Sequence, residues 1–153
     1  MRRTIYFADL THCGTITNAD TFPLGIGSIA ATVAHRFPGL VSVELFKFPD
    51  DLNQALENYF PDILCLSNYA WNLNLSLAFA RYVREHSPNT VIVMGGPNIC
   101  ITEAGREVFL VDHDYIDFYI KYEGEIAFCD LLSQLFDSNF EVNKIREKKI
   151  KVA

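Results

Sequence analysis

Glycine, hydroxyl, amide and acidic residues gather at four places in this sequence, each directly after a short apolar run. Ligands of open parallel sheets bind outside the carboxyl ends of the strands, so residues at such places could share one site. Glycine lets a ligand approach the backbone closely, and hydroxyl and amide groups donate and accept hydrogen bonds. The candidate binding residues are Thr11, His12, Gly14, Ser67, Asn68, Tyr69, Trp71, Asn72, Gly95, Gly96, Pro97, Glu123, Gly124 and Glu125.

The chemistry of these residues favours binding over catalysis. Tyr69 and Trp71 offer flat apolar surface, and the four places are poor in lysine and arginine. A bulky ligand that carries many amides therefore fits better than a naked polyphosphate. We assign no catalytic residue to this chain.

Each place also has a purely structural interpretation. The segment 67–72 could cap a helix, and Gly95-Gly96-Pro97 could form an ordinary tight turn. The acids Glu123 and Glu125 could oppose a helix dipole, and His12 could simply be solvated. The placement of all four groups after apolar runs favours a common site.

Short β-branched or aromatic runs alternate with helical patterns and would position these residues. The predicted strands are Thr4–Ala8, Ser42–Phe46, Ile63–Ser67, Val91–Met94 and Ile116–Ile120. Apolar residues at helical spacing begin near Ile26, Leu52, Leu75 and Phe128, and a short helix is expected after Thr102. This order predicts an α/β fold: a doubly wound five-stranded parallel sheet in a flavodoxin-like (Rossmann-like) three-layer sandwich.

Turn and cap residues agree with this division. Pro38-Gly39 and Ser87-Pro88-Asn89 end the first and third helical patterns. Asp50 and Thr102 are the expected N-caps of the second and fourth helices. The loop from Asp9 to Pro23 is much longer than the about 2–6 residues usual between a strand and a helix, which favours a functional role for it.

Composition narrows the class of protein. The chain has 153 residues, enough for one domain, and a net charge of −6 without the basic stripe that nucleic acid requires. No apolar run reaches the length of a membrane span. Its four cysteines are far apart in sequence, which suits a reducing, cytoplasmic location. We expect one domain over residues 1–137 and a charged tail over 138–153 that could be the start of a linker or a frayed end.

Several of these segments together resemble the N-terminal cobalamin-binding domain of cobalamin-dependent radical S-adenosylmethionine (SAM) enzymes. The resemblance covers roughly residues 4–137. It rests on Phe22-Pro23-Leu24-Gly25-Ile26-Gly27, Pro61-Asp62-Ile63-Leu64-Cys65-Leu66-Ser67, Trp71-Asn72, Val93-Met94-Gly95-Gly96-Pro97-Asn98, Ile116-Asp117, and Glu123-Gly124-Glu125 with Phe128 and Leu131-Leu132.

The resemblance implies that the domain holds cobalamin with its dimethylbenzimidazole tail extended into the sheet domain. Ser67 and Gly95-Gly96 would line the tail, Glu123-Gly124-Glu125 would close the nucleotide end, and Leu24 and Gly25 join the binding residues. A valine at Gly96 should then fill the space of the ligand and leave the fold intact.

In that family a separate barrel carries a CxxxCxxC motif for a [4Fe–4S] cluster, and this sequence lacks the motif. The cluster and SAM would thus belong to a radical SAM catalytic domain of the same parent chain. This chain would be a fragment or a stand-alone carrier that catalyses nothing by itself.

Other cobalamin domains ligate cobalt through the histidine of a DxHxxG motif. Here Asp9, His12 and Gly14 read DxxHxG, with the histidine one residue late. A one-residue slip moves the ring nitrogen, so we expect no protein ligand to cobalt from His12 and assign no metal-binding residue.

Three other interpretations remain open. A phospho-acceptor receiver domain would suit Lys121, but it requires an aspartate where Ser67 stands. An FMN-binding flavodoxin-like domain would suit the loop Thr11-His12-Cys13-Gly14-Thr15, although the predicted helix begins only near Pro23. A ligand-free interaction module is the third alternative.

Overall fold

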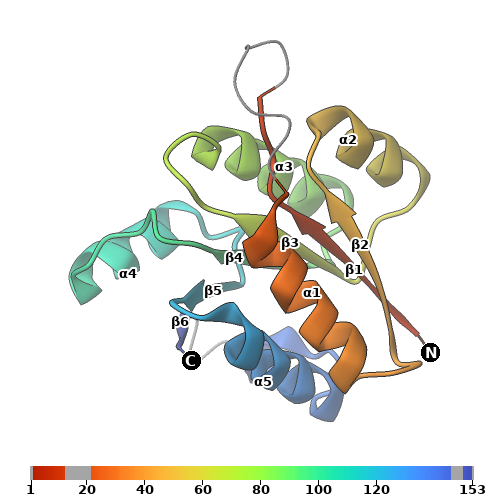
Figure 1. Cartoon of the computed structure of the whole chain (residues 1–153). Coiled ribbons are helices and arrows are strands. Elements are labelled where there is room, and N and C mark those ends of the chain that lie inside the picture. Colours follow the sequence, from red (N-terminus) through yellow and green to blue (C-terminus); the bar gives the residue numbers. More distant parts are fainter. Residues whose placement is uncertain (1, 13–21, 146–149, 153) are drawn as a thin grey trace.

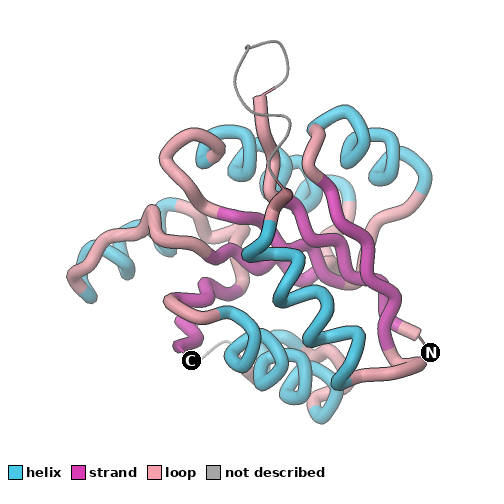
Figure 2. Tube along the Cα trace, viewed as in Figure 1, coloured by secondary structure: helices cyan, strands magenta, loops and turns pink. Residues whose placement is uncertain are grey.

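The computed structural model describes residues 2–12, 22–145 and 150–152. It contains one parallel sheet with strand order β2-β1-β3-β4-β5-β6 and helices on both faces (Figures 1 and 2). The strands are β1 Arg3–Ala8, β2 Val41–Phe46, β3 Ile63–Ser67, β4 Val91–Gly95, β5 Phe118–Lys121 and β6 Ile150–Val152. The helices are α1 Leu24–Arg36, α2 Pro49–Asn58, α3 Leu73–His86, α4 Glu103–Asp112, α5 Gly124–Asp137 and a short 3₁₀ turn, η1 Val142–Lys144.

The central strands are buried on both faces, which explains their unbroken apolar sequences. Every residue of β3 is buried, as are the first four residues of β4. These two strands pair in register so that Ser67 at the end of β3 lies opposite Gly95 at the end of β4. The predicted flavodoxin-like parallel sheet is confirmed, and two of its polar places are therefore neighbours.

The structure adds a short sixth strand that the sequence analysis did not predict. Residues 150–152 pair in parallel with β5 at the edge of the sheet. Phe140, Val142 and Ile145 are partly buried against the apolar core on the α1–α5 side of the sheet. The described part of the expected tail therefore contacts the domain.

Two apolar clusters hold the helices to the sheet. One lies between the sheet and the helices α1 and α5, and includes Phe7, Ile26, Cys65 and Phe128. The other lies on the opposite face, between the sheet and the helices α2, α3 and α4. The pair α1–α5 makes its own contact across the first face (Figure 1).

Helix boundaries match the expectations at three of the four punctuation sites. Helix α1 ends at Arg36 before Pro38, and α3 ends at His86 before Pro88. The Thr102 hydroxyl accepts a hydrogen bond from the Gly105 N–H at 3.2 Å, as an N-cap should. The prediction for Asp50 is wrong: Phe48 is the N-cap of α2, because Pro49 already takes the first helical position and leaves Asp50 in the first turn.

Ion pairs stabilise the edge of the sheet at which the strands begin. Arg3 pairs with Asp62, and Arg84 pairs with the buried Asp117, each at 2.6 Å. The Asp117 carboxylate also accepts a hydrogen bond from the Ile92 N–H at 2.8 Å. These ion pairs and this hydrogen bond hold the amino-terminal edge of the sheet together.

None of the helices in the described part of the chain has the length and apolar character of a membrane span.

Candidate functional site

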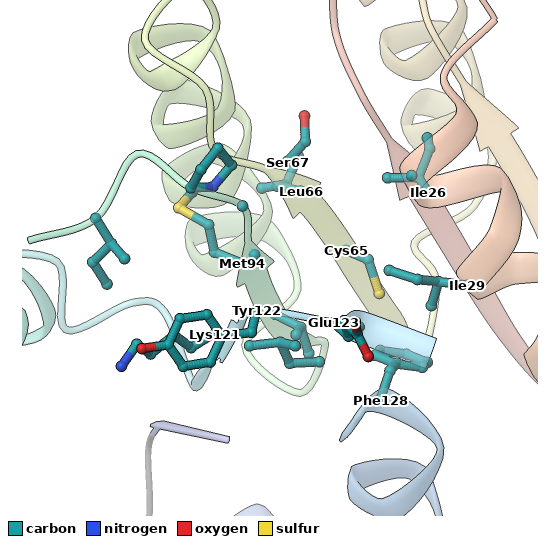
Figure 3. A pocket seen from close by; sticks show the side chains of 18 of the residues that line it. Ile26, Ile29, Cys65, Leu66, Ser67, Met94, Lys121, Tyr122, Glu123 and Phe128 are labelled. Carbon is teal, nitrogen blue, oxygen red and sulfur yellow. The ribbon is translucent and has the colours of Figure 1, made fainter. Parts of the chain in front are cut away.

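A cavity of about 520 Å³ opens at the carboxyl edge of the sheet, between the ends of β3, β4 and β5 and the helices α1 and α5 (Figure 3). Its position is the usual one for ligands of open α/β sheets. Its size falls in the range of small-molecule and cofactor pockets. Side chains from α1, β3, β4, β5 and α5 meet around it although they are far apart in sequence.

The inner wall of the cavity is apolar. Ile26 and Ile29 reach it from α1, Cys65 from β3 and Phe128 from α5 (Figure 3). Cys65 and Phe128 are 6% and 2% exposed, and burial raises the pKa of the Cys65 thiol well above its usual range. At neutral pH this thiol is therefore a neutral, weakly polar group. The inner wall suits a flat apolar part of a ligand.

The mouth of the cavity is polar and more exposed. Tyr122 is 72% exposed, with the Lys121 ammonium 4.1 Å from the centre of its ring. Glu125, in the first turn of α5, accepts a hydrogen bond from the Ser28 hydroxyl on α1 at 2.7 Å. That bond is the main reason why the pKa of Glu125 is lowered. The mouth can hydrogen-bond to polar parts of a ligand while the inner wall takes its apolar part.

The glycines around the cavity differ in what a side chain at their position would contact. Gly96 has a φ of 126°, and a Cβ at this position would lie 2.6 Å from the carbonyl oxygen of Asn68. This contradicts the expectation that a valine at Gly96 leaves the fold intact, because the clash is with backbone rather than with a ligand. Gly25 differs: a Cβ there would meet only the Tyr69 hydroxyl, at 3.8 Å.

The Ser67 hydroxyl belongs to a buried polar network at the end of β3. It donates to Asp9 Oδ1 at 2.6 Å and accepts from Asn72 Nδ2 at 2.8 Å. Asn72 Nδ2 also lies 3.1 Å from Asp9 Oδ1, and the Asn72 side-chain oxygen accepts from the Tyr69 N–H at 2.9 Å. Ser67 lines the cavity, but its hydroxyl points away from Cys65 and Phe128 (Figure 3). The network joins the loops after β1 and β3.

Asn68 is fully buried and supports the loop after β4. Its Nδ2 donates to the Asn98 carbonyl at 2.7 Å and to the Tyr119 hydroxyl at 3.0 Å, and its Oδ1 accepts from Asn98 Nδ2 at 3.0 Å. Tyr119 in turn donates to the Gly96 carbonyl at 2.7 Å. Burial raises the pKa of Tyr119 to about 12, so its hydroxyl stays protonated and remains a donor.

The aromatic residues after β3 form a stacked pair at the same edge. Tyr69 and Trp71 lie 4.4 Å apart between ring centroids, with an interplanar angle of 6°. Tyr69 lines the cavity, whereas Trp71 does not and is 61% exposed. The Nε2 atom of His12 lies 2.8 Å from the Trp71 carbonyl oxygen, which makes this nitrogen the donor. His12 thus connects the loop after β1 to the loop after β3.

The cavity therefore brings together nine of the predicted binding residues: Gly25, Ser67, Tyr69, Gly95, Gly96, Pro97, Glu123, Gly124 and Glu125. Away from its lining are Thr11, His12, Leu24, Asn68, Trp71 and Asn72, and Gly14 is outside the described residues. The sequence analysis missed the inner wall, including Ile29, Cys65, Val93, Ile120 and Phe128. The sequence carried no signal for them, because β3 and β4 are unbroken apolar runs and the pairing of Cys65 with Val93 is known only from the structure.

The arrangement of the lining residues suits the binding of a ligand with an apolar part and a polar part. Among the residues described in the structure, no group of three or more His, Cys, Asp or Glu side chains could hold a metal ion. A receiver domain would need a carboxylate at the end of β3, where Ser67 stands with its hydroxyl hydrogen-bonded. The cavity can instead enclose a flat apolar group and bind polar groups at its mouth.

Comparison with known proteins gives two related sequences, while no family model matches the chain. The cobalamin-dependent radical SAM methyltransferase TokK of Streptomyces tokunonensis is 38% identical over 73 residues, or 48% of this chain. A 2-(S-pantetheinyl)-carbapenam-3-carboxylate methyltransferase of Streptantibioticus cattleyicolor is 30% identical over 135 residues, or 85% of this chain. The matches span only 10% and 18% of these proteins.

Solved structures share the fold at lower identity. The cobalamin-dependent SAM radical enzyme OxsB, solved with aqua-cobalamin and SAM, superposes with a TM-score of 0.69 at 19% identity, over 89% of this chain and 19% of that one. The receiver domain of RcsB from Salmonella enterica serovar Typhimurium superposes with a TM-score of 0.62 at 15% identity, over 90% of each chain. These likenesses confirm the flavodoxin-like sheet.

Proposed function

We propose that this chain, a homologue of the cobalamin-dependent radical SAM methyltransferases, is a cobalamin-binding domain. The observation that carries the proposal is the cavity at the carboxyl edge of β3, β4 and β5, apolar inside and polar at its mouth. The sequence relationship to TokK, a methyltransferase named as cobalamin-dependent, supports the same ligand.

The residues present fit the parts of cobalamin. Its dimethylbenzimidazole is flat and apolar and matches the inner wall formed by residues such as Cys65 and Phe128. Its ribose and amide groups can donate to the carboxylates of Glu123 and Glu125 at the mouth. Gly25 leaves the helix α1 open toward this space, since a Cβ there would have only the Tyr69 hydroxyl within 4 Å. When bound, cobalamin supplies a cobalt centre that can carry a methyl group.

The role of this chain would be to bind the cofactor, hold its tail and keep water from the buried base. Methyl transfer, SAM and the [4Fe–4S] cluster would belong to a radical SAM domain of the same parent chain, which we place in the cytoplasm. Residues 1–137 would form the binding domain, and the described part of 138–153 would pack against it. We assign His12 no bond to cobalt, since its ring lies against the Trp71 carbonyl and outside the lining of the cavity.

Equilibrium dialysis of the chain against hydroxocobalamin and, separately, FMN tests this function. We expect saturable binding of hydroxocobalamin with a change in its visible spectrum, and no saturable binding of FMN. The variant Gly25→Leu should bind hydroxocobalamin at least about tenfold more weakly, equivalent to about 1.4 kcal/mol, because its side chain enters the mouth of the cavity.

Ala34→Leu is the matched control, since it adds the same kind of bulk to an exposed position of α1. It should bind like the original chain, and circular dichroism should show both variants folded. Binding of FMN in place of cobalamin, or binding of neither, would refute the proposal. An equal loss in both leucine variants would refute the assignment to this cavity.

A further inference from the structure

The buried end of the cavity presents almost no hydrogen-bonding group to a ligand. Among the described lining residues, Phe7, Cys65, Val93, Ile120 and Phe128 are each at most 6% exposed, and four of them are hydrocarbon side chains. Cys65 contributes a thiol, which is only a weak donor and acceptor. A polar group of a ligand placed here would therefore lose its water without gaining a strong partner.

The backbone of the strands that carry this wall offers no free hydrogen-bonding group to a ligand either. Phe7 pairs with Cys65 between β1 and β3, Cys65 pairs with Val93 between β3 and β4, and Val93 pairs with Phe118 between β4 and β5. Their N–H and carbonyl groups are used within the sheet. The Ser67 hydroxyl is used as well, by Asp9 and Asn72.

We propose that this wall makes the site selective for cobamides with an apolar benzimidazole as lower base, and that it rejects those with a purine. The proposal rests on the proposed cobalamin-binding function. Dimethylbenzimidazole buries only C–H and methyl groups on its six-membered ring. Adenine buries an amino group and ring nitrogens there, and unpaired buried polar groups weaken binding.

Two other features of the bases do not alter this comparison. The imidazole ring is common to both bases, so its nitrogens make the same demand in each. Adenine is the weaker cobalt ligand, so releasing it from cobalt costs less. A preference for cobalamin could therefore not arise from that step.

Two cysteines of the same cavity allow a matched test of the wall. Cys65 is buried in the inner wall, whereas Cys100 is exposed at the mouth. The substitution Cys65→Ser adds a hydroxyl where the purine would lie. The same substitution at Cys100 adds a hydroxyl at an exposed position, where water can already hydrogen-bond to the polar groups of a ligand. Only the inner variant should change the selectivity.

The experiment is equilibrium dialysis of the chain with three probes: hydroxocobalamin, its analogue with adenine as lower base, and cobinamide, which lacks the nucleotide. We expect hydroxocobalamin to bind at least about tenfold more tightly than either of the others, equivalent to about 1.4 kcal/mol. Cys65→Ser should reduce the ratio between the first two probes at least threefold, while Cys100→Ser should leave it unchanged. If Cys65→Ser does not fold by circular dichroism, Val93→Thr provides the same inner hydroxyl.

The outcomes separate this inference from the function on which it rests. Binding of none of the probes would refute the cobalamin function. Equal affinity for both nucleotide-bearing probes, above that of cobinamide, would keep the function and overturn the selectivity. Equal affinity for all three would place the base outside this cavity and overturn the inference. A ratio changed equally by both serine variants would also overturn it.

Discussion

Gly96 and Gly25 lie at the same edge of the sheet but meet different constraints. Gly96 has a positive φ and presses against the Asn68 backbone, so its lack of a side chain serves the loop after β4. Gly25 lies in the first turn of α1 with space beside it, so its lack of a side chain serves the cavity. The same residue type therefore permits a loop conformation at one position and leaves open space beside the cavity at the other.

Gly96→Ala should destabilise the chain by about 1–3 kcal/mol, because alanine adds backbone strain and a clash with the Asn68 carbonyl oxygen. Urea denaturation measures the free energy of unfolding of this variant and of a control variant. Gly25→Ala is the control and should be neutral or slightly stabilising, since its Cβ has normal contact distances and alanine favours a helix. Equal stability of the two variants would contradict this division of roles.

Helices α1 and α5 form a pair that closes one side of the cavity. A Cβ on Gly124 would lie 2.3 Å from the Ile29 side chain, so the start of α5 packs closely on α1. The Ser28 hydroxyl donates to Glu125 across the same contact, at 2.7 Å. The position of the cavity mouth thus depends on a helix–helix contact that is partly electrostatic.

Stability should depend on pH through the Ser28–Glu125 pair. The pKa of Glu125 is lowered in the folded chain, mainly by the Ser28 hydroxyl, so the pair stabilises the fold above the ordinary glutamate pKa of 4.5. Ser28→Ala should lower the free energy of unfolding by less than about 1 kcal/mol at pH 7, because the pair is partly exposed. The difference from the original chain should shrink as the pH falls below 4.5 and through the lowered pKa of Glu125.

Urea midpoints of both chains between pH 7 and pH 3 measure this change. Ser133→Ala on α5 is the control, since its hydroxyl donates to the Cys129 backbone carbonyl, which does not titrate. A difference for Ser28→Ala that stays constant over the whole range would show that the ionised carboxylate does not contribute.

The sheet edge, the two loops after β3 and β4, and the α1–α5 pair together surround one cavity. Its parts are joined by the network around Ser67 and by the bonds among Asn68, Asn98 and Tyr119. A ligand in the cavity would contact elements from both ends of the chain, from Gly25 to Phe128. Binding should therefore stabilise the whole domain rather than one loop.

Hydroxocobalamin at a free concentration of 100 times its Kd should stabilise the folded chain by about 2.7 kcal/mol. For a domain of this size, the corresponding rise in Tm is roughly 5–10 °C. Differential scanning calorimetry measures it. Gly25→Leu at the same ligand concentration should show a smaller rise, in proportion to its weaker binding. An equal rise in both chains would place the ligand elsewhere.

The sequence alone determined the α/β class, the five main strands and the edge at which the cavity opens. Buried parallel strands require unbroken β-branched runs such as Val91–Met94, and their covering helices require apolar stripes such as that beginning at Ile26. Such patterns are local and can be read without knowing which strands are neighbours. The same patterns placed Gly95 and Glu123 at strand ends, where the cavity opens.

Only the tertiary structure decided which side chains face the cavity. The sequence suggested Ser67, Asn68 and Asn72 as ligand contacts. Their polar groups instead form hydrogen bonds within the protein, because strand pairing brings Asp9, Asn98 and Tyr119 within hydrogen-bond distance of them. The inner wall combines residues of α1, β3, β4, β5 and α5, which are distant in sequence and look like ordinary core. A hydroxyl or an apolar side chain becomes part of a site only through its neighbours in space, and those are set by the packing of the whole domain.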